Sequence, residues 1–296
     1  MRDSAVIDRP GLSRVPSPAL VLGSILSVQL GAAFARTTFD EFGAAGTSAL
    51  RLSWAGVLML ILVRPSLRGR TRRDLGLVLV FGLVLGTMNL CFYEAVARIP
   101  LGIAVTVEFL GPLGVALAGS RRALDLVWVV CAATGVVLLA HPGGSSGLDS
   151  LGVLFALFAA CGWATYIVLG QRLGGRFAGA DGSALAMIVA AFVPLAPGIA
   201  QSGGTLLTVH ALWVGLVVGT LSSALPYTLE IEALRRIPRH VFGVLMSLEP
   251  GVGALAGFVV LGQSLRAGQV AAIALVVLAS IGASRTAAVA PAPLEP

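Results

Sequence analysis

The feature that most constrains this chain is a succession of apolar stretches, each about 20 residues long, that fills most of its length. A helix that crosses a lipid bilayer needs about 20 predominantly apolar residues. By that rule we expect ten membrane-spanning helices. Their predicted bounds are 18–35, 44–63, 74–97, 101–119, 125–140, 150–170, 180–200, 211–232, 240–261 and 267–284.

Composition excludes the other broad classes of protein. Of the 296 residues, 57% are hydrophobic and 11% are charged, and the mean hydropathy is +0.94. A soluble domain averages roughly 45–50% apolar and about 25% charged residues. So few polar residues cannot cover a water-soluble globule, and the apolar content excludes a disordered chain. The sequence therefore predicts an all-α polytopic membrane protein.

The arginines predict the orientation of the chain. All 20 basic residues are arginines, and 16 of them fall in the tails and loops of one side of the ten-span arrangement. The other side holds Arg36, Arg98 and Arg266. By the positive-inside rule, the tails 1–17 and 285–296 are both expected in the cytoplasm. The net charge of +6 forms no basic-aromatic patch, so we expect no nucleic-acid partner.

An internal repeat predicts how the spans are organised. The Gly- and Ser-containing linker 141–149 separates a first five-helix repeat, 18–140, from a second, 150–284. At an offset of 138 residues, 11 of the 26 positions in 94–119 are identical in the second half, without a gap. Because each repeat has an odd number of spans, the two are expected in opposite orientations. Such inverted repeats are typical of secondary transporters, whose substrate site lies near the midplane.

Charged residues inside a span need a partner or a function, because each costs about 2.5–3.5 kcal/mol on insertion scales. Glu94 precedes Arg98 by four residues, and Glu232 precedes Arg236 in the same way. Glutamate four residues before a basic residue is the favoured order for an ion pair on one helix. We interpret both pairs as structural salt bridges.

Three further charged residues are the main functional candidates: Arg51, Glu108 and Glu249. Arg51 and Glu108 each lie seven residues into a span from the outer side, about 10 Å deep at about 1.5 Å per residue. They can form a static salt bridge, or they can hold the two charges of a zwitterion. Glu249 lies near the middle of its span with no arginine at its depth in its own half. It is either a satisfied core carboxyl or a group that exchanges protons during transport.

Two prolines are expected to break helices near these carboxylates. Pro112 follows Glu108 and Pro250 follows Glu249 within one helical turn. Proline leaves a backbone carbonyl without its helical donor, and such carbonyls at membrane depth usually line a cavity. Other polar or aromatic side chains at intermediate depth can serve either packing or substrate contact. These candidates are Gln29, Asn89, Tyr93, Trp163, Tyr166, Ser222, Ser223 and Tyr227.

Signatures of catalysis and of cofactor binding are missing from the sequence. It has no HExxH motif and no phosphate-binding loop. Its three cysteines are far apart in apolar runs, and its three histidines stand alone, so we predict no catalytic residue, no metal site and no cofactor. A multipass membrane enzyme and a passive channel remain as alternatives. The inverted repeat and the absence of a catalytic constellation disfavour an enzyme, and the scarcity of pore-lining charges disfavours a channel.

Several motifs carry a resemblance to a known family. They are Ala49-Leu50-Arg51-Leu52, Met88-Asn89 with Phe92-Tyr93, Ile99-Pro100-Leu101-Gly102, Glu108-Phe109 with Gly111-Pro112, Ser223-Ala224-Leu225-Pro226-Tyr227 and Met246-Ser247-Leu248-Glu249-Pro250. Over about residues 20–284 the chain resembles the ten-helix drug/metabolite transporter superfamily of EamA type. Within that superfamily it is most similar to the inner-membrane threonine/homoserine exporters. Glu94 and the tail 287–296 depart from their pattern.

The resemblance implies a function. It implies proton-coupled efflux of threonine, homoserine or a similar small amino acid across a bacterial inner membrane. Export of drugs or other small metabolites on the same scaffold is the alternative, because one fold carries many substrates. The implied partners are the small-molecule substrate, protons and the lipid bilayer, and the oligomeric state stays open.

Overall fold

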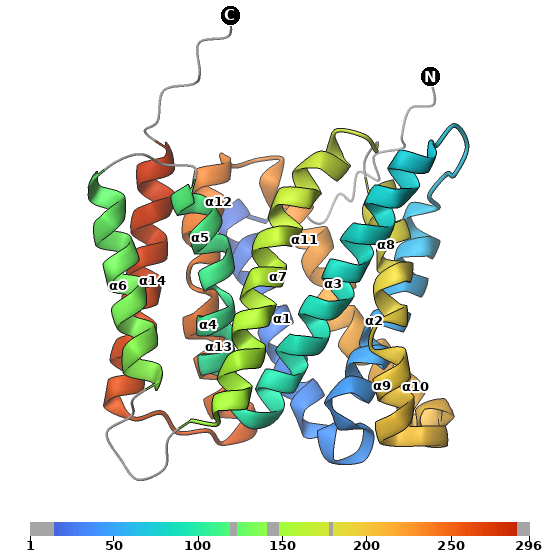
Figure 1. The fold of residues 1–296 in the computed structure, drawn as a ribbon, viewed down its shortest axis with the longest axis horizontal. Helices are drawn as coiled ribbons and strands as arrows, with labels where there is room; N and C mark the ends of the chain where they lie inside the picture. The colour runs from blue at the N-terminus through green and yellow to red at the C-terminus, as the bar shows by residue number, and fades with distance from the viewer. Residues whose placement is uncertain (1–14, 119–122, 141–147, 178–179, 289–296) are drawn as a thin grey trace, which may run out of the picture.

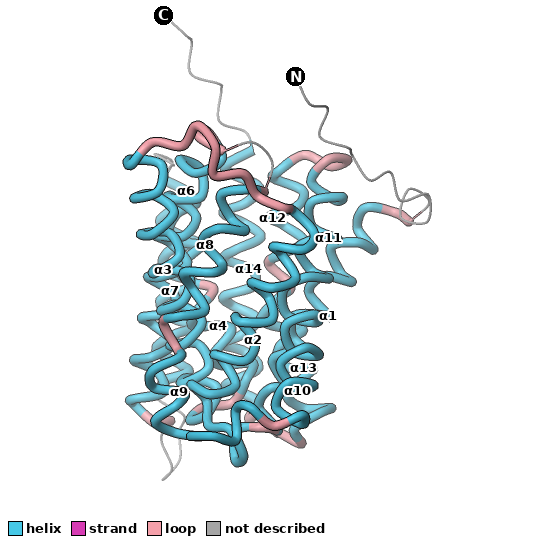
Figure 2. Tube along the Cα trace, turned by 90° about the vertical axis from the view of Figure 1, so that its right-hand side faces the viewer, coloured by secondary structure: helices cyan, strands magenta, loops and turns pink. Residues whose placement is uncertain are grey.

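All secondary structure in the described part of this protein is helical (Figures 1 and 2). The computed structural model describes residues 15–118, 123–140, 148–177 and 180–288. Eight helical stretches within these ranges are long and apolar enough to cross a membrane, and Ala267–Ala283 forms a shorter apolar helix. The expected all-α membrane fold is thus confirmed. Arg121, Arg122, most of the predicted linker 141–149 and most of both tails lie outside the described residues.

Each predicted span corresponds to one helix or to consecutive helices joined within it. The helices before the predicted linker are α1 (Ser17–Thr37), α2 (Phe39–Val63), α3 (Arg72–Arg98), α4 (Leu101–Glu108), α5 (Leu110–Ala118) and α6 (Ala123–Ala140). The later elements are α7 (Ser150–Gly174), α8 (Asp181–Phe192), α9 (Leu195–Ser202), the short helix η2 (Gly203–Leu207), α10 (Val209–Gly219), the π-helical segment η3 (Thr220–Ala224), α11 (Leu225–Leu234), α12 (Arg239–Met246), α13 (Glu249–Leu261) and α14 (Ala267–Ala288).

Local sequence accounts for several of the helix ends and breaks. Thr71 and Asp74 form a capping box at the start of α3, and the Asp149 carboxylate accepts the first free amides of α7. Within α2, Gly43 takes a non-helical conformation with a φ of 66°, which glycine adopts without steric cost. The breaks within the spans 180–200 and 211–232 were not predicted from the sequence. The first falls beside Pro194, and the second is the π-helical segment η3.

Helices from the two halves of the chain interlock, and their contacts come in exchanged pairs. α3 packs along α7, and α1 packs along α11; α3 packs on α8, and α2 packs on α10. Other extensive contacts join α2 to α8 and α9, α4 to α13 and α6 to α14. Small residues allow the close approaches. A Cβ at Gly82 or Gly86 would lie 2.6 Å from a backbone oxygen of α8, so these two glycines let α3 and α8 pack closely.

Several loops and helix ends lie together at one end of the bundle. The loop between α2 and α3 and the last turn of α14 lie at the upper end in Figure 1. Val15, directly before α1, accepts a hydrogen bond from Arg236, which follows α11 at that same end. The largest buried core cluster includes Phe39, Phe42 and Tyr93. Large apolar side chains are exposed on the outside, where a membrane protein contacts lipid, among them Phe158, Phe192, Trp213 and Phe258.

Candidate functional site

A cavity of about 240 Å³ lies inside the helical bundle. Both halves of the chain contribute to its wall. All but one of the eleven charged, polar or aromatic candidates line this single cavity: Gln29, Arg51, Asn89, Glu108, Trp163, Tyr166, Ser222, Ser223, Tyr227 and Glu249. Residues up to 220 positions apart in the sequence therefore face the same space.

Two helix breaks place carboxylates on the cavity wall. Glu108 is the last residue of α4, and Glu249 is the first residue of α13. Pro112 cannot donate the helical hydrogen bond to the Glu108 carbonyl, and Pro250 cannot donate to the carbonyl four residues before it. Pro112 lines a neighbouring cavity of about 330 Å³, whereas Pro250 is buried. Each proline thus leaves one backbone carbonyl, that of Glu108 or that of Met246, without its helical donor.

Arg51 is the basic group of the site. Its Nη2 atom donates a hydrogen bond to the Ser222 carbonyl over 3.1 Å, and its guanidinium lies 5.4 Å from the centre of the Tyr93 ring. Its buried Nε–H has no partner among the described residues. In that same part of the chain, no ion pair joins Arg51 to Glu108, so the static salt bridge considered above is absent. The guanidinium keeps donor capacity for an anionic group.

The two carboxylates at the helix breaks have few partners. Glu249 is 6% exposed; its Oε1 atom accepts a hydrogen bond from Gln29 Nε2 over 3.1 Å, and its Oε2 atom has no partner within the described ranges. Glu108 is 8% exposed and lines the same cavity. Neither is paired with a basic side chain in the described structure. Carboxylates within membrane spans commonly serve a function, so these two carboxylates make this cavity the candidate functional site.

Aromatic residues shape the wall and support Arg51. The Trp163 ring meets Phe109 edge-on at 5.6 Å, and Tyr166 packs on Phe81 at 4.8 Å. Tyr93 is the candidate that does not line the cavity. It is 1% exposed and packs against Phe39 with ring centres 5.5 Å apart. Tyr93 therefore supports the Arg51 guanidinium from within the core.

Sequence reasoning missed a third carboxylate on the wall. Glu230 lines the cavity from α11, and Ser24 of α1 donates a hydrogen bond to it over 2.6 Å. The sequence spacing could have identified Glu230, because Ser223, Tyr227 and Glu230 fall on one face of a helix. Further wall residues that were not singled out are Met59, Phe81, Ser183, Met187 and Met246.

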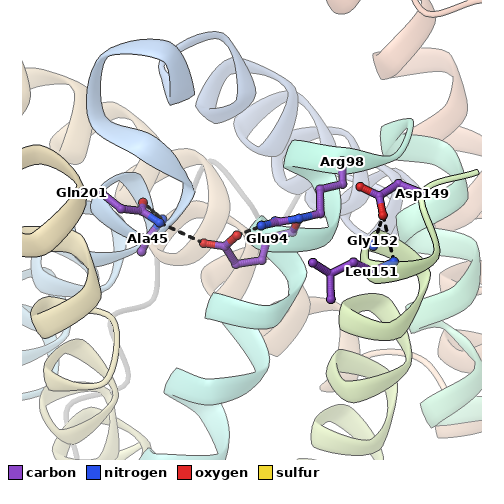
Figure 3. A network of polar contacts seen from close by, with 7 residues as sticks. All are labelled: Ala45, Glu94, Arg98, Asp149, Leu151, Gly152 and Gln201. Atoms are coloured by element: carbon purple, nitrogen blue, oxygen red, sulfur yellow. Dashed lines mark hydrogen bonds and ion pairs between the residues drawn. The ribbon is translucent and has the colours of Figure 1, made fainter.

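The predicted salt bridges lie away from this cavity. Arg98 pairs with Glu94, and Arg236 pairs with Glu232, which confirms both predictions. Figure 3 shows the first pair in its network. There the Gln201 amide oxygen accepts the Ala45 backbone N–H over 3.0 Å, and its amide nitrogen donates to Glu94 over 3.4 Å. Ala45 lies two residues after the kink at Gly43 in α2. The hydrogen bond from Ala45 to Gln201 therefore joins α9 to α2 at this kink.

Comparison with known proteins agrees with this arrangement. Residues 150–285 match the EamA-like transporter family. Threonine/homoserine exporter RhtA of Salmonella typhimurium (strain LT2) is 43% identical over 286 residues, which cover 94% of this chain and 95% of that protein. Threonine/homoserine exporter RhtA of Escherichia coli (strain K12) is 42% identical over 272 residues, 90% of each chain.

One solved crystal structure superimposes on this fold. It has a TM-score of 0.62 at 20% sequence identity, over 91% of this chain and 98% of the other. The helical membrane fold and its central polar cavity define a multipass membrane transporter. The relatives are similar over nearly their whole length, and the chain belongs to the EamA-like transporter family.

Proposed function

We propose that this protein is a secondary active exporter of small amino acids such as threonine and homoserine in a bacterial inner membrane. The observation that carries the proposal is the central cavity, in which Arg51 faces the same space as two carboxylates that have no cationic partner within the described ranges. The relatives that are 42–43% identical are named as exporters of these amino acids, which supports the substrate class.

The cavity suits a zwitterion. Arginine binds carboxylates through several donors held in a fixed plane, so Arg51 is the group we assign to the substrate carboxylate. Its Nε–H is free for that contact among the described residues. Glu108 and Glu249 are the acceptors we assign to the ammonium group. Gln29, Asn89 and Ser223 add polar groups on the wall that can fix the orientation of the substrate.

Proton coupling is the part of the proposal that rests on Glu249. An ionisable carboxylate within a membrane span commonly serves as a proton relay in transporters. Glu249 has one oxygen bonded to Gln29 and one without a partner in the described structure. Binding of a proton and binding of the substrate ammonium at this carboxylate would exclude each other. That competition is what exchange of a proton for an amino acid requires.

The architecture that supports this mechanism is two inverted five-helix repeats, 18–140 and 150–284. The exchanged pairs of helix contacts support it, since α3 packs on α7 as α1 packs on α11. The helix breaks at Glu108 and Glu249 fall in the fourth and ninth predicted spans, which correspond in the two repeats. The arginine distribution supports cytoplasmic termini.

Reporter fusions after Ser66 and at the C-terminus should report a cytoplasmic location, and a fusion within 143–147 should report an external one. An external C-terminus would contradict this topology.

The function is tested by uptake of labelled threonine into inverted membrane vesicles, with and without an imposed pH gradient. Uptake that depends on the gradient and is competed by homoserine supports the proposal. The matched control is vesicles from cells without the protein. A panel of other amino acids and of uncharged drugs separates the candidates. Uptake of drugs without competition by amino acids would favour the alternative exporter, and gradient-independent flux would favour a channel.

A further inference from the structure

The charges on the cavity wall exceed what a small zwitterion can balance. Three carboxylates line the cavity, those of Glu108, Glu230 and Glu249, and Arg51 is the single basic side chain among the described lining residues. A threonine molecule brings one carboxylate and one ammonium group. With Arg51 on its carboxylate and both mid-cavity carboxylates, Glu108 and Glu249, on its ammonium, the Glu230 carboxylate is left without a charged partner from the substrate.

Glu230 is the acidic group that stands apart. It lies on α11, and its hydrogen-bond donor in the described structure is the hydroxyl of Ser24, which is fully buried. Two residues later on the same helix, Glu232 is paired with Arg236 through Nε over 2.9 Å. Glu230 has no such basic partner within the described residues, although Arg235 and Arg236 lie close in the sequence.

The mid-cavity carboxylates point independently to a cationic ligand. Glu249 is more than nine-tenths buried, lines the cavity, and has an Oε2 atom without a partner in the described ranges. The cavity therefore offers acceptors for positive charge at two places: at the helix breaks, and at Glu230 further toward the end where α11 finishes.

The distance between the Arg51 contact and Glu230 sets the length of ligand that can reach both groups. The Ser222 carbonyl, which Arg51 contacts, lies eight residues before Glu230 on the same span. At about 1.5 Å per residue, that is a separation of about 12 Å along the helix axis. A threonine side chain is too short to reach across it. A basic amino acid with an extended methylene chain is longer, and the apolar wall residues Phe81, Met187 and Met246 can cover its methylene groups.

From this geometry we infer that the cavity also binds and exports amino acids with a terminal side-chain ammonium, such as ornithine and lysine. Glu230 binds the side-chain ammonium, and Ser24 is a positioning residue that orients the Glu230 carboxylate. Arg51 and the mid-cavity carboxylates bind the backbone carboxylate and α-ammonium, as for threonine. This inference rests on the proposed function and extends its substrate class.

The test compares two substrates in the same inverted vesicles. Wild-type protein should take up labelled ornithine saturably, with competition by threonine. Glu230→Gln should raise the KM for ornithine at least about tenfold, because it removes a charge-assisted contact, and should change the KM for threonine less than about twofold. Ser24→Ala should raise the ornithine KM less than Glu230→Gln does, with kcat retained. Glu230→Asp, which keeps the charge, should restore part of the ornithine affinity.

Controls separate the possible failures. Glu232→Gln removes a neighbouring carboxylate of the same helix that does not line the cavity, so it should leave the ratio of the two KM values unchanged. Wild-type protein that moves threonine but not ornithine overturns this inference alone. Equal loss of both substrates in folded Glu230→Gln protein also overturns it. A wild type that moves no amino acid overturns the proposed function, and this inference with it.

Discussion

Five of the glutamates of this protein fall into two groups that differ in their partners and their position. Glu94 and Glu232 lie near helix ends, outside the cavity, each paired with an arginine four residues later. Glu108, Glu230 and Glu249 line the cavity, and no basic side chain within the described residues pairs with them. In the first group, an arginine of the same helix neutralises the charge of each glutamate. In the second group, the carboxylates are left able to bind a ligand or a proton.

This difference teaches how a membrane protein separates stability from function. An ion pair four residues apart forms within a single helix and needs no other element. A charged carboxylate that faces a cavity without a cation is unfavourable in free energy within a membrane. Binding of a ligand or a proton must offset that free energy. The comparison predicts that substitutions in the cavity group change transport, and that those in the paired group change stability slightly.

The largest effect is expected from the mid-cavity charges. Arg51→Ala and Glu108→Gln should each lower threonine uptake about 10- to 100-fold, because each removes a charged contact with the substrate worth about 1.5–3 kcal/mol. Uptake in inverted vesicles measures the loss, and size-exclusion profiles and thermal unfolding check that the folded protein persists. Loss of folded protein in both variants, with rescue by a charge-swapped double variant, would instead indicate a structural ion pair.

Glu249→Gln should break coupling while keeping part of the binding. The glutamine has the shape of the protonated carboxyl but cannot release a proton. We therefore expect gradient-driven threonine efflux to be lost, with substrate binding weakened yet detectable by ligand-dependent thermal stabilisation. Gradient-driven transport at the wild-type rate would remove Glu249 from the mechanism and make Glu108 the next residue to test.

A smaller effect, on stability, is expected where the first helix break packs on its neighbour. A Cβ added at Gly111 would lie 2.2 Å from the Ala160 carbonyl oxygen, whereas one at Gly114 on the same helix meets nothing within 4 Å. Gly111→Ala should therefore cost about 1–3 kcal/mol of unfolding free energy, with Gly114→Ala as the matched control. Thermal unfolding of both variants measures the difference. Equal melting temperatures would show that α5 and α7 can separate at this contact without cost.

The smallest effect is expected from the paired glutamates. Glu94→Gln and Glu232→Gln should leave threonine uptake within about twofold of wild type and lower stability by at most about 1 kcal/mol, the usual range for ion pairs that are partly exposed. Uptake and melting temperature are measured together for each variant. If Glu94→Gln lowers uptake as strongly as Glu108→Gln does, the division between the two groups of glutamates is wrong.

Much of the candidate site could be predicted because polar residues are rare in these spans. Arg51, Glu108 and Glu249 stand out from apolar surroundings, and the structure brings all three to one cavity. Tyr93 and Glu230 show the limit of that reasoning. Tyr93 is a polar aromatic residue of the kind that lines cavities, but it packs in the core. Glu230 was not predicted, although it lines the cavity. Both outcomes depend on how each helix is rotated about its own axis.

The sequence by itself determined the class of fold and the local pairs. Apolar stretches of spanning length require helices in a membrane, since every backbone polar group must be satisfied within the segment. The Glu94 and Glu232 salt bridges follow in the same way from spacing within one helix. Only the tertiary structure decided which polar side chains share the cavity. Those contacts join residues such as Gln29 and Glu249, 220 positions apart, and depend on the packing of many helices at once, which no local pattern in the chain encodes.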